Sequence, residues 1–217
     1  MNDDSIPAAL AELRQQVQDV IAPGSFLLST GELSRYWVRI GDLADATQGL
    51  IATIVAGCIP RFHRYAQIGT VFVPRLTMTS QDEHPLDFVP RDVPGLLASG
   101  DFPVKFVRVR FENHNQVDIP DTEGPGSWLG ILTLSVHFDM IMTILDSLER
   151  RHHPVSHVLV VVEREKRTRE SLTARGVNLV PMIICTGETG QARTIIEMTE
   201  EPYRQYHKFF IDEPAQG

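Results

Sequence analysis

Residues 163–172, with the sequence EREKRTRESL, bring charged side chains together directly after a continuous apolar run, SHVLVVVE (156–163). Arg164 stands where a buried strand would end. A planar guanidinium binds a carboxylate, or another planar acceptor, through two parallel hydrogen bonds. Arg164 is therefore a candidate ligand-binding residue. The alternative is a surface arginine that is solvated or ion-paired within the charged run.

A second pair of candidate groups consists of Arg108, in the alternating segment PVKFVRVRF (103–111), and His114, just beyond it. The next segment, NHNQVDIPDTEGPGS (113–127), is polar and rich in turn formers, so we expect a mobile loop there. An arginine and a histidine at such a loop could bind an anion. An exposed strand end followed by a loop histidine is the alternative.

Three histidines, His152, His153 and His157, lie close together in the sequence and raise the question of a metal site. They lack a helical i, i+4 pair with a nearby acid, and Arg150 and Arg151 beside them disfavour a bound cation. We predict a solvated helix end and no metal site.

The composition limits the classes of function. The 217 residues carry a formal net charge of −8, which argues against binding to a nucleic-acid backbone. The two cysteines, Cys58 and Cys185, lie in apolar runs and are predicted to be buried free thiols. No apolar run approaches the ~20 residues of a membrane span, and the acidic N-terminal segment lacks a secretory pattern. We expect a cytoplasmic protein that binds neither nucleic acid nor membrane.

Helical and strand-like patterns alternate along the chain. Helices are predicted at 5–21, 44–59, 168–175 and from Asp139, as a cap, to about Arg151. Pro23-Gly24 is predicted to end the first of these helices. Strands are predicted at 69–74, 103–111, 130–134, 156–163 and 177–185, with two short strands in 26–43 and a long loop or inserted lobe at 76–103. This order predicts an α/β doubly wound or related parallel sheet, with ligands beyond the carboxyl ends of its strands.

Three stretches, in this order along the chain, resemble the orotate phosphoribosyltransferase family. FLLSTGELSRYWVRIGDL (26–43) is similar to its N-terminal segment at Phe26, Leu28, Gly31, Ser34 and Tyr36. KFVRVRFENHN (105–115) is similar to its mobile loop at Arg108 and His114. Residues 130–183 are similar to its phosphoribosyl-diphosphate strand and loop and to a later charged segment, which matches at Glu163, Arg164, Arg169 and Leu172.

The resemblance implies a type I phosphoribosyltransferase fold, with a central, mostly parallel sheet flanked by helices. It implies one domain over 1–217, with a helix and hood strands at 1–43, an α/β core at 44–185 and a helical tail at 186–217. It also implies a homodimer, because the family's mobile loop reaches into the neighbouring subunit's site. The candidate ligand-binding residues are then Arg164, Thr30, Tyr36, Arg108, His114 and Thr143.

The same resemblance places the family's phosphate chemistry on unsuitable residues. Where the family has two carboxylates for the ribose hydroxyls, this chain has Ser135 and Val136. Where the family has a glycine-containing turn that cradles the 5′-phosphate, this chain has Asp139, Met140, Ile141 and Met142, and Val109 and Glu112 replace two loop lysines. A β-branched residue is poorly suited to close approach to a phosphate, and an aspartate repels it. We therefore predict that no catalytic residues for phosphoribosyl transfer remain.

The interpretation that follows is a catalytically inactive or repurposed relative that needs no cofactor. It would sense a nucleobase or nucleotide, or regulate a protein partner, as a homodimer. One alternative is an active phosphoribosyltransferase for orotate or a related pyrimidine base, with an atypical phosphate loop and with Mg²⁺ held by Asp139. The other alternative is a purely structural interaction subunit.

Overall fold

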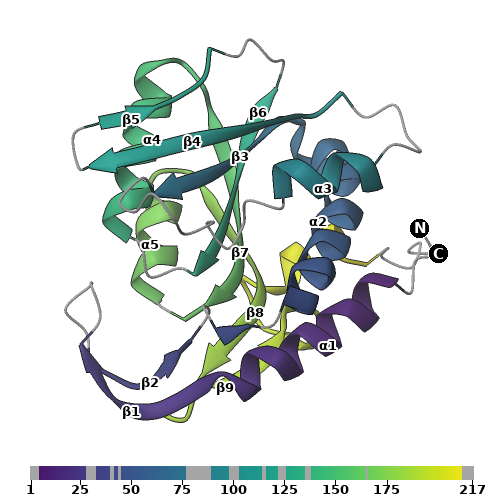
Figure 1. The fold of residues 1–217 in the computed structure, drawn as a ribbon, viewed down its shortest axis with the longest axis vertical. Coiled ribbons are helices and arrows are strands. Elements are labelled where there is room, and N and C mark those ends of the chain that lie inside the picture. The colour runs from purple at the N-terminus through teal and green to yellow at the C-terminus, as the bar shows by residue number, and fades with distance from the viewer. Residues whose placement is uncertain are drawn as a thin grey trace.

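The computed structural model describes residues 5–27, 33–39, 42–43, 45–76, 89–97, 103–113, 116–121, 126–134, 138–164 and 166–211. Its helices are α1 (Ser5–Asp19), α2 (Asp45–Ala66), α3 (Val89–Leu96), α4 (Phe138–Arg150) and α5 (Lys166–Ala174), with short 3₁₀ helices η2 (Ile195–Glu197) and η3 (Arg204–Phe209) (Figure 1). Its strands are β1 (Ile21–Leu27), β2 (Leu33–Val38), β3 (Ile68–Leu76), β4 (Lys105–Asn113), β5 (Gln116–Asp118), β6 (Ser127–Leu134), β7 (Val155–Glu163), β8 (Asn178–Thr186) and β9 (Gln191–Thr194).

In the described part of the chain, seven strands form one sheet in the order β5-β4-β3-β6-β7-β8-β9. The pairs from β4 to β8 are parallel, whereas β5 and β9 are antiparallel edge strands. The strand order reverses between β3 and β6, and ligands of doubly wound sheets bind beyond the carboxyl ends of the strands at such a point. The segments that follow these two strands, 77–88 and 135–137, lie outside the described residues.

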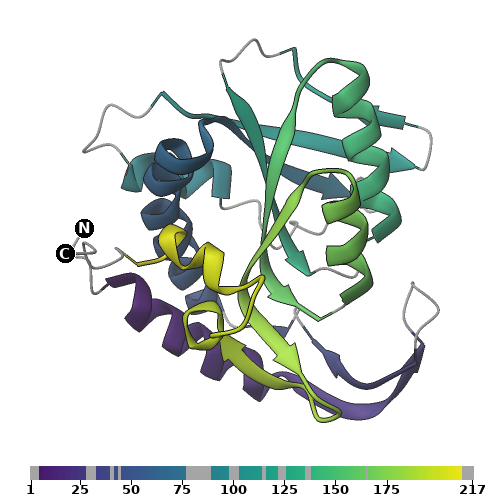
Figure 2. The ribbon, with the colours of Figure 1, turned by 180° about the vertical axis from the view of Figure 1, so that it is seen from behind.

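Helices cover both faces of the sheet, which explains why β7 is apolar along most of its length. One hydrophobic cluster joins α1, α2, α3 and the C-terminal 3₁₀ segment to one face. The second cluster joins α4 and α5 to the opposite face. Figures 1 and 2 show this arrangement from opposite sides, with strands β1 and β2 as a separate two-stranded ribbon beside β8 and β9. The predicted α/β fold with a mostly parallel sheet is confirmed.

Two elements extend beyond their predicted bounds. Helix α2 continues through Pro60 to Ala66, because Phe62 lies beyond the proline and is fully buried. Burial of that ring offsets the roughly 3 kcal/mol that an internal proline costs a helix. Helix α1 ends before Pro23-Gly24, as predicted, and strand β1 begins earlier than expected and runs through Pro23, with a register shift between Pro23 and Phe26. A proline is tolerated there because each strand of a two-stranded ribbon is an edge strand.

Two other segments differ in type from their prediction. The region predicted as a loop or inserted lobe contains helix α3, where Val89 and Val93 bury one face at i, i+4 spacing. The tail predicted to be helical begins with strand β9, whose pairing with β8 satisfies the backbone groups of that edge, and 3₁₀ turns follow it. The short lengths of these elements hid their periodicity from the sequence analysis.

Cys58 and Cys185 are both free and buried, as predicted. Among the described residues, no helix combines the length and the apolar character that a membrane span requires.

His157, near the start of β7, lies edge-on to two stacked rings, Phe62 and Phe209. Its Nδ1 atom is 2.9 Å from the Ser156 hydroxyl oxygen. Burial, assisted by the nearby Lys208 cation, lowers the pKa of His157 from 6.5 to about 4. The imidazole is therefore neutral in the folded protein at neutral pH, and it belongs to the core rather than to a solvated helix end.

This lowered pKa predicts acid sensitivity. Between pH 6.5 and 4 the unfolded chain binds a proton at His157 that the folded protein does not bind. The free energy of unfolding should therefore fall over that range, by on the order of 2 kcal/mol because the ring keeps some solvent contact. Urea titrations should show that His157→Phe removes this part of the pH dependence, whereas His152→Gln, at an exposed histidine, keeps it. Equal pH dependence in the His157→Phe variant and the parent would contradict the assignment.

Candidate ligand site at the carboxyl edge of the sheet

Arg164 follows the last residue of β7, at the edge of the sheet where the fold predicts a ligand. Its guanidinium carbon lies 4.8 Å from the centre of the Trp37 ring and 5.3 Å from that of Tyr36. All three guanidinium nitrogens are shielded from solvent. Arg164 is thus packed against β2 by cation–π contacts and is not a solvated surface arginine.

Tyr36 fastens the β1–β2 ribbon to the main sheet. Its hydroxyl donates a hydrogen bond to the Cys185 carbonyl oxygen at 3.2 Å, and the residue is only 6% exposed. A Cβ atom at Gly190 would lie 2.5 Å from the Tyr36 ring, and Gly190 has a φ of +71°. Only glycine meets both conditions. Tyr36 therefore holds Arg164 and Trp37 at the end of β7, so the ribbon forms one wall of the candidate site.

The Cys185 thiol belongs to the same neighbourhood. Burial raises its pKa to about 12, although the Arg164 cation favours the thiolate. The thiol is therefore protonated and unreactive at neutral pH.

The residues predicted to fill the phosphate turn lie within helix α4. Asp139 is exposed in the first turn, one residue after the helix begins at Phe138, so the prediction that it caps the helix was wrong. Met140 and Ile141 are 7% and 1% exposed and pack in the second hydrophobic cluster, with Met142 partly buried beside them. The backbone at these positions is helical rather than an open turn.

Thr143, the hydroxyl that resembles the end of the phosphate turn, bonds within α4. Its Oγ1 donates to the Asp139 carbonyl oxygen at 2.8 Å, and its own carbonyl oxygen accepts from Ser147. Arg108 is exposed on β4, where it pairs with Val73 of β3. Val109, at a position where the family has a loop lysine, is fully buried. The other predicted positions, Thr30, His114, Ser135 and Val136, lie outside the described residues.

Glu163 and Arg169, which flank Arg164 in the matched segment, form a buried bidentate ion pair. Arg169 donates through Nε at 2.7 Å and through an Nη atom at 2.6 Å, and both side chains are less than a tenth exposed. The Arg169 guanidinium also lies over the rings of Tyr203 and Tyr206. This pair ties β7 and α5 to the C-terminal segment, so its role is structural.

The sequence analysis missed Trp37, Tyr203 and Tyr206. Trp37 neighbours Tyr36 in β2, so alternation along the strand would direct it away from Arg164. The two tyrosines lie more than 30 residues after Glu163, in a segment without a clear period. No local pattern indicated these contacts.

The donor set does not fit the Mg²⁺ ion that the enzyme alternative requires. Of the positions matched to the ribose and phosphate groups, Asp139 alone is a carboxylate. Within the residues that the structure describes, no three His, Cys, Asp or Glu side chains gather as a metal site would require. Mg²⁺ prefers carboxylate and phosphate oxygens in octahedral geometry.

Comparison with solved structures shows that this mostly parallel sheet flanked by helices has the fold of the type I phosphoribosyltransferases. The orotate phosphoribosyltransferase of Mycobacterium tuberculosis H37Rv, in complex with inorganic phosphate, superposes with a TM-score of 0.54 at 19% identity, over 80% of this chain and 94% of that one. The Francisella tularensis orotate phosphoribosyltransferase gives a TM-score of 0.52 at 16% identity, over 92% and 94%. Leishmania donovani UMP synthase gives 0.53 at 14% identity, over 80% and 35%.

No family model and no curated protein matches the chain by sequence. At these identities the structural likeness establishes the fold, and the predicted orotate phosphoribosyltransferase-like architecture is confirmed.

Proposed function

We propose that this phosphoribosyltransferase-fold protein does not transfer phosphoribosyl groups and instead binds a nucleobase or nucleotide at Arg164, as a sensing or partner-regulating dimer. The observation that carries the proposal is the position of Met140 and Ile141, at the expected phosphate turn, as buried residues of helix α4. A phosphate cradle needs several backbone N–H groups that converge on the anion. Met140 and Ile141 instead direct buried side chains into the core, so neither position offers the glycine that lets a phosphate approach the backbone closely.

Electrostatics supports the same proposal. Asp139 presents its carboxylate in the first turn of α4, where a phosphate dianion would have to approach. Arg164 offers a planar guanidinium between the ribbon and the end of β7. A planar acidic ligand could replace part of the aromatic contact and accept two hydrogen bonds from Arg164. The ribbon would then respond to ligand, because Tyr36 and Trp37 lie on it.

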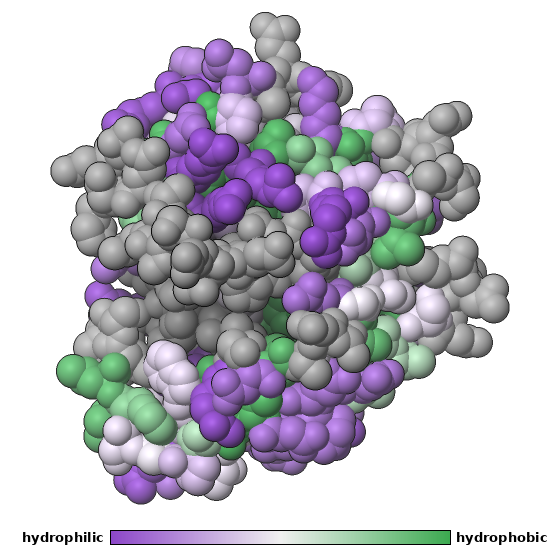
Figure 3. Space-filling model, viewed as in Figure 1, coloured by the Kyte–Doolittle hydropathy of each residue, from purple (hydrophilic) through white to green (hydrophobic). Residues whose placement is uncertain are grey.

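Exposed apolar surface on the ribbon supports a protein partner or a second copy. Leu27 and Leu33 face each other across the end of the β1–β2 pair and are 75% and 72% exposed. Figure 3 shows hydrophobic surface at the lower left, where Figure 1 places this ribbon. Exposed apolar side chains gathered in this way are typical of interaction surfaces.

The decisive experiment combines activity and binding. With Mg²⁺, phosphoribosyl diphosphate and orotate, we expect no diphosphate release above background, and turnover of ~1 per second would contradict the proposal. Thermal-shift and calorimetric screens of nucleobases and nucleotides should identify a ligand whose binding is lost in Arg164→Met but kept in Arg167→Met, at an exposed position of α5. Absence of any such ligand, in a protein that light scattering shows to be a dimer, would favour the structural-subunit alternative.

A further inference from the structure

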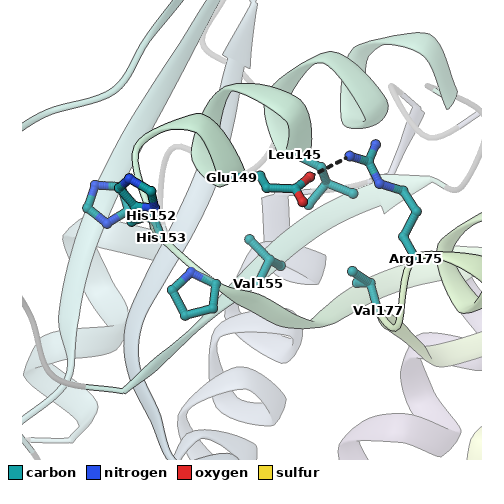
Figure 4. Close-up of a pocket in the computed structure, with 8 residues that line it drawn as sticks. Leu145, Glu149, His152, His153, Val155, Arg175 and Val177 are labelled. Atoms are coloured by element: carbon teal, nitrogen blue, oxygen red, sulfur yellow. Dashed lines mark hydrogen bonds and ion pairs between the residues drawn. The ribbon is translucent and has the colours of Figure 1, made fainter.

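A pocket opens at the amino-terminal edge of the sheet, opposite the edge that carries Arg164. It lies between the end of α4, the start of β7 and the residues that join α5 to β8, and its volume is about 690 Å³ (Figure 4). Small-molecule sites have volumes of roughly 300–1,000 Å³. Val155 in its wall is about 26 Å from Glu163 at the other end of β7, at roughly 3.3 Å per residue. The pocket is therefore separate from the candidate site at the carboxyl edge.

The base of the pocket is apolar and fixed. Leu145 and Val177 are 4% and 5% exposed, and Pro154 and Val155 continue the apolar surface between them. His153 is held in place because its ring stacks on the buried Trp128, with centroids 4.5 Å apart and planes 24° apart. A flat ring could lie on this surface without rearranging the core.

The polar wall opposite the histidines is an ion-paired group in which two carboxylates share one guanidinium. Arg175 donates hydrogen bonds to Asp146 and, at 3.1 Å, to Glu149, as Figure 4 shows for Glu149. The Glu149 side chain is 78% exposed, so its carboxylate can accept further hydrogen bonds from a ligand at the rim.

His152 completes the rim. It has a φ of +60°, at the position just after a helix where glycine is usual, and its ring lines the pocket. The backbone N–H of His152 donates to the Glu149 carbonyl oxygen at 2.9 Å. This hydrogen bond fixes the backbone position from which the imidazole side chain extends. A neutral imidazole offers one donor and one acceptor, and Glu149 offers acceptors only.

The charge around the pocket disfavours an anion. Both α4 and α5 end there, and helix C-termini carry partial negative charge. Among the described residues that line the pocket, Arg175 is the one arginine or lysine, and it is already bonded to Glu149 of the lining and to Asp146 beside it. Arg150 donates instead to its own helix, at the Asp146 carbonyl oxygen and the Ser147 hydroxyl.

We infer that this pocket binds an uncharged planar nitrogen heterocycle of nucleobase size or larger, with its face on Val155 and Val177 and its N–H edge toward Glu149 and His152. The bound ring would lie across the end of α4, the start of β7 and the residues that join α5 to β8. Phosphorylated forms of the same ring should bind more weakly, because the acidic rim and the helix ends repel the phosphate. This site does not depend on the function proposed for Arg164.

The test is a ¹H–¹⁵N NMR titration of the full chain with adenine, cytosine and benzimidazole. At least one of them should produce saturable shifts in the amides of 145–155 and 175–177, with a Kd near or below ~1 mM. Adenosine monophosphate should bind at least about fivefold more weakly than adenine, because its phosphate meets the acidic rim.

Variants separate ligand binding from folding. Glu149→Gln should weaken binding roughly tenfold, since a bond to a charged acceptor is lost, while Asp146 still holds Arg175. His152→Gly should weaken binding about threefold without lowering the melting temperature, because glycine suits its backbone. Arg150→Gln, outside the pocket on the same helix end, should leave binding unchanged.

Four results would overturn the inference, of which three concern the pocket itself. These are no saturable shift in the pocket amides at ~5 mM of any of the three heterocycles, no effect of Glu149→Gln, or tighter binding of the monophosphate than of adenine. Shifts confined to residues around Arg164 would also overturn it, while supporting the function proposed for the carboxyl edge.

Discussion

Replacement of Arg169 by methionine is expected to lower the free energy of unfolding by about 3–5 kcal/mol, because it leaves the Glu163 carboxylate buried without its partner. Glu163 is 3% exposed and Arg169 is 7% exposed, so neither charge can recover hydration in place. Urea unfolding followed by circular dichroism measures the loss.

The pH dependence of this variant gives a second readout. Burial already raises the pKa of Glu163, although Arg169 and a hydrogen bond with Tyr203 oppose that rise. Without Arg169 the pKa should rise further, so the folded variant takes up a proton that the unfolded chain binds only at lower pH. Its free energy of unfolding should therefore recover as the pH falls below the raised folded-state pKa, and the cost of Arg169→Met should be largest at alkaline pH.

Two control variants test whether the cost of Arg169→Met comes from the unpaired buried charge of Glu163. The double variant Glu163→Leu with Arg169→Met removes both charges and should be clearly more stable than Arg169→Met alone. Asp42→Asn breaks an exposed pair with Arg39, 53% exposed on each side, and should cost less than about 1 kcal/mol. A cost for Arg169→Met as small as that of Asp42→Asn would show that the buried pair does not hold β7, α5 and the C-terminal segment together.

The strand–helix order of the second half was predictable because its elements are long and strongly patterned. The run SHVLVVVE became β7, and the bounds of α4 and α5 agree with their predictions to within two residues. Helix α3 and strand β9 were missed, since elements of eight and four residues show too little of a period to be told from loops.

The site was predictable only in part, for a similar reason. Arg164 was identified by its type and by its place after a strand, which are local properties. Its contact with Trp37 joins residues 127 positions apart and depends on how the ribbon docks on β8. The pocket beside His152 and Arg175 arises where two helix ends meet, and the sequence analysis had predicted a solvated helix end at these histidines.

Replacement of Ile141 by glycine is expected to cost about 3–6 kcal/mol, the combined effect of an emptied core position and a glycine in a helix. Ile141 is 1% exposed and packs in the cluster between α4 and the sheet. Glycine is the residue that a phosphate turn requires at such a place. The stability of this variant therefore distinguishes a helix packed in the core from an open, phosphate-binding turn at this segment. Asp139→Gly, exposed in the first turn of the same helix, should cost only about 1 kcal/mol.

The comparison should be made by urea unfolding, with helix content followed by circular dichroism. If 138–143 were an open turn able to receive a phosphate, glycine at 141 would relieve the backbone and leave stability nearly unchanged. A near-neutral Ile141→Gly variant, above all one that gained affinity for phosphoribosyl diphosphate with Mg²⁺, would remove the main argument against phosphoribosyl transfer. The expected large loss, without any gain in affinity, would instead support the proposal that this protein does not transfer phosphoribosyl groups.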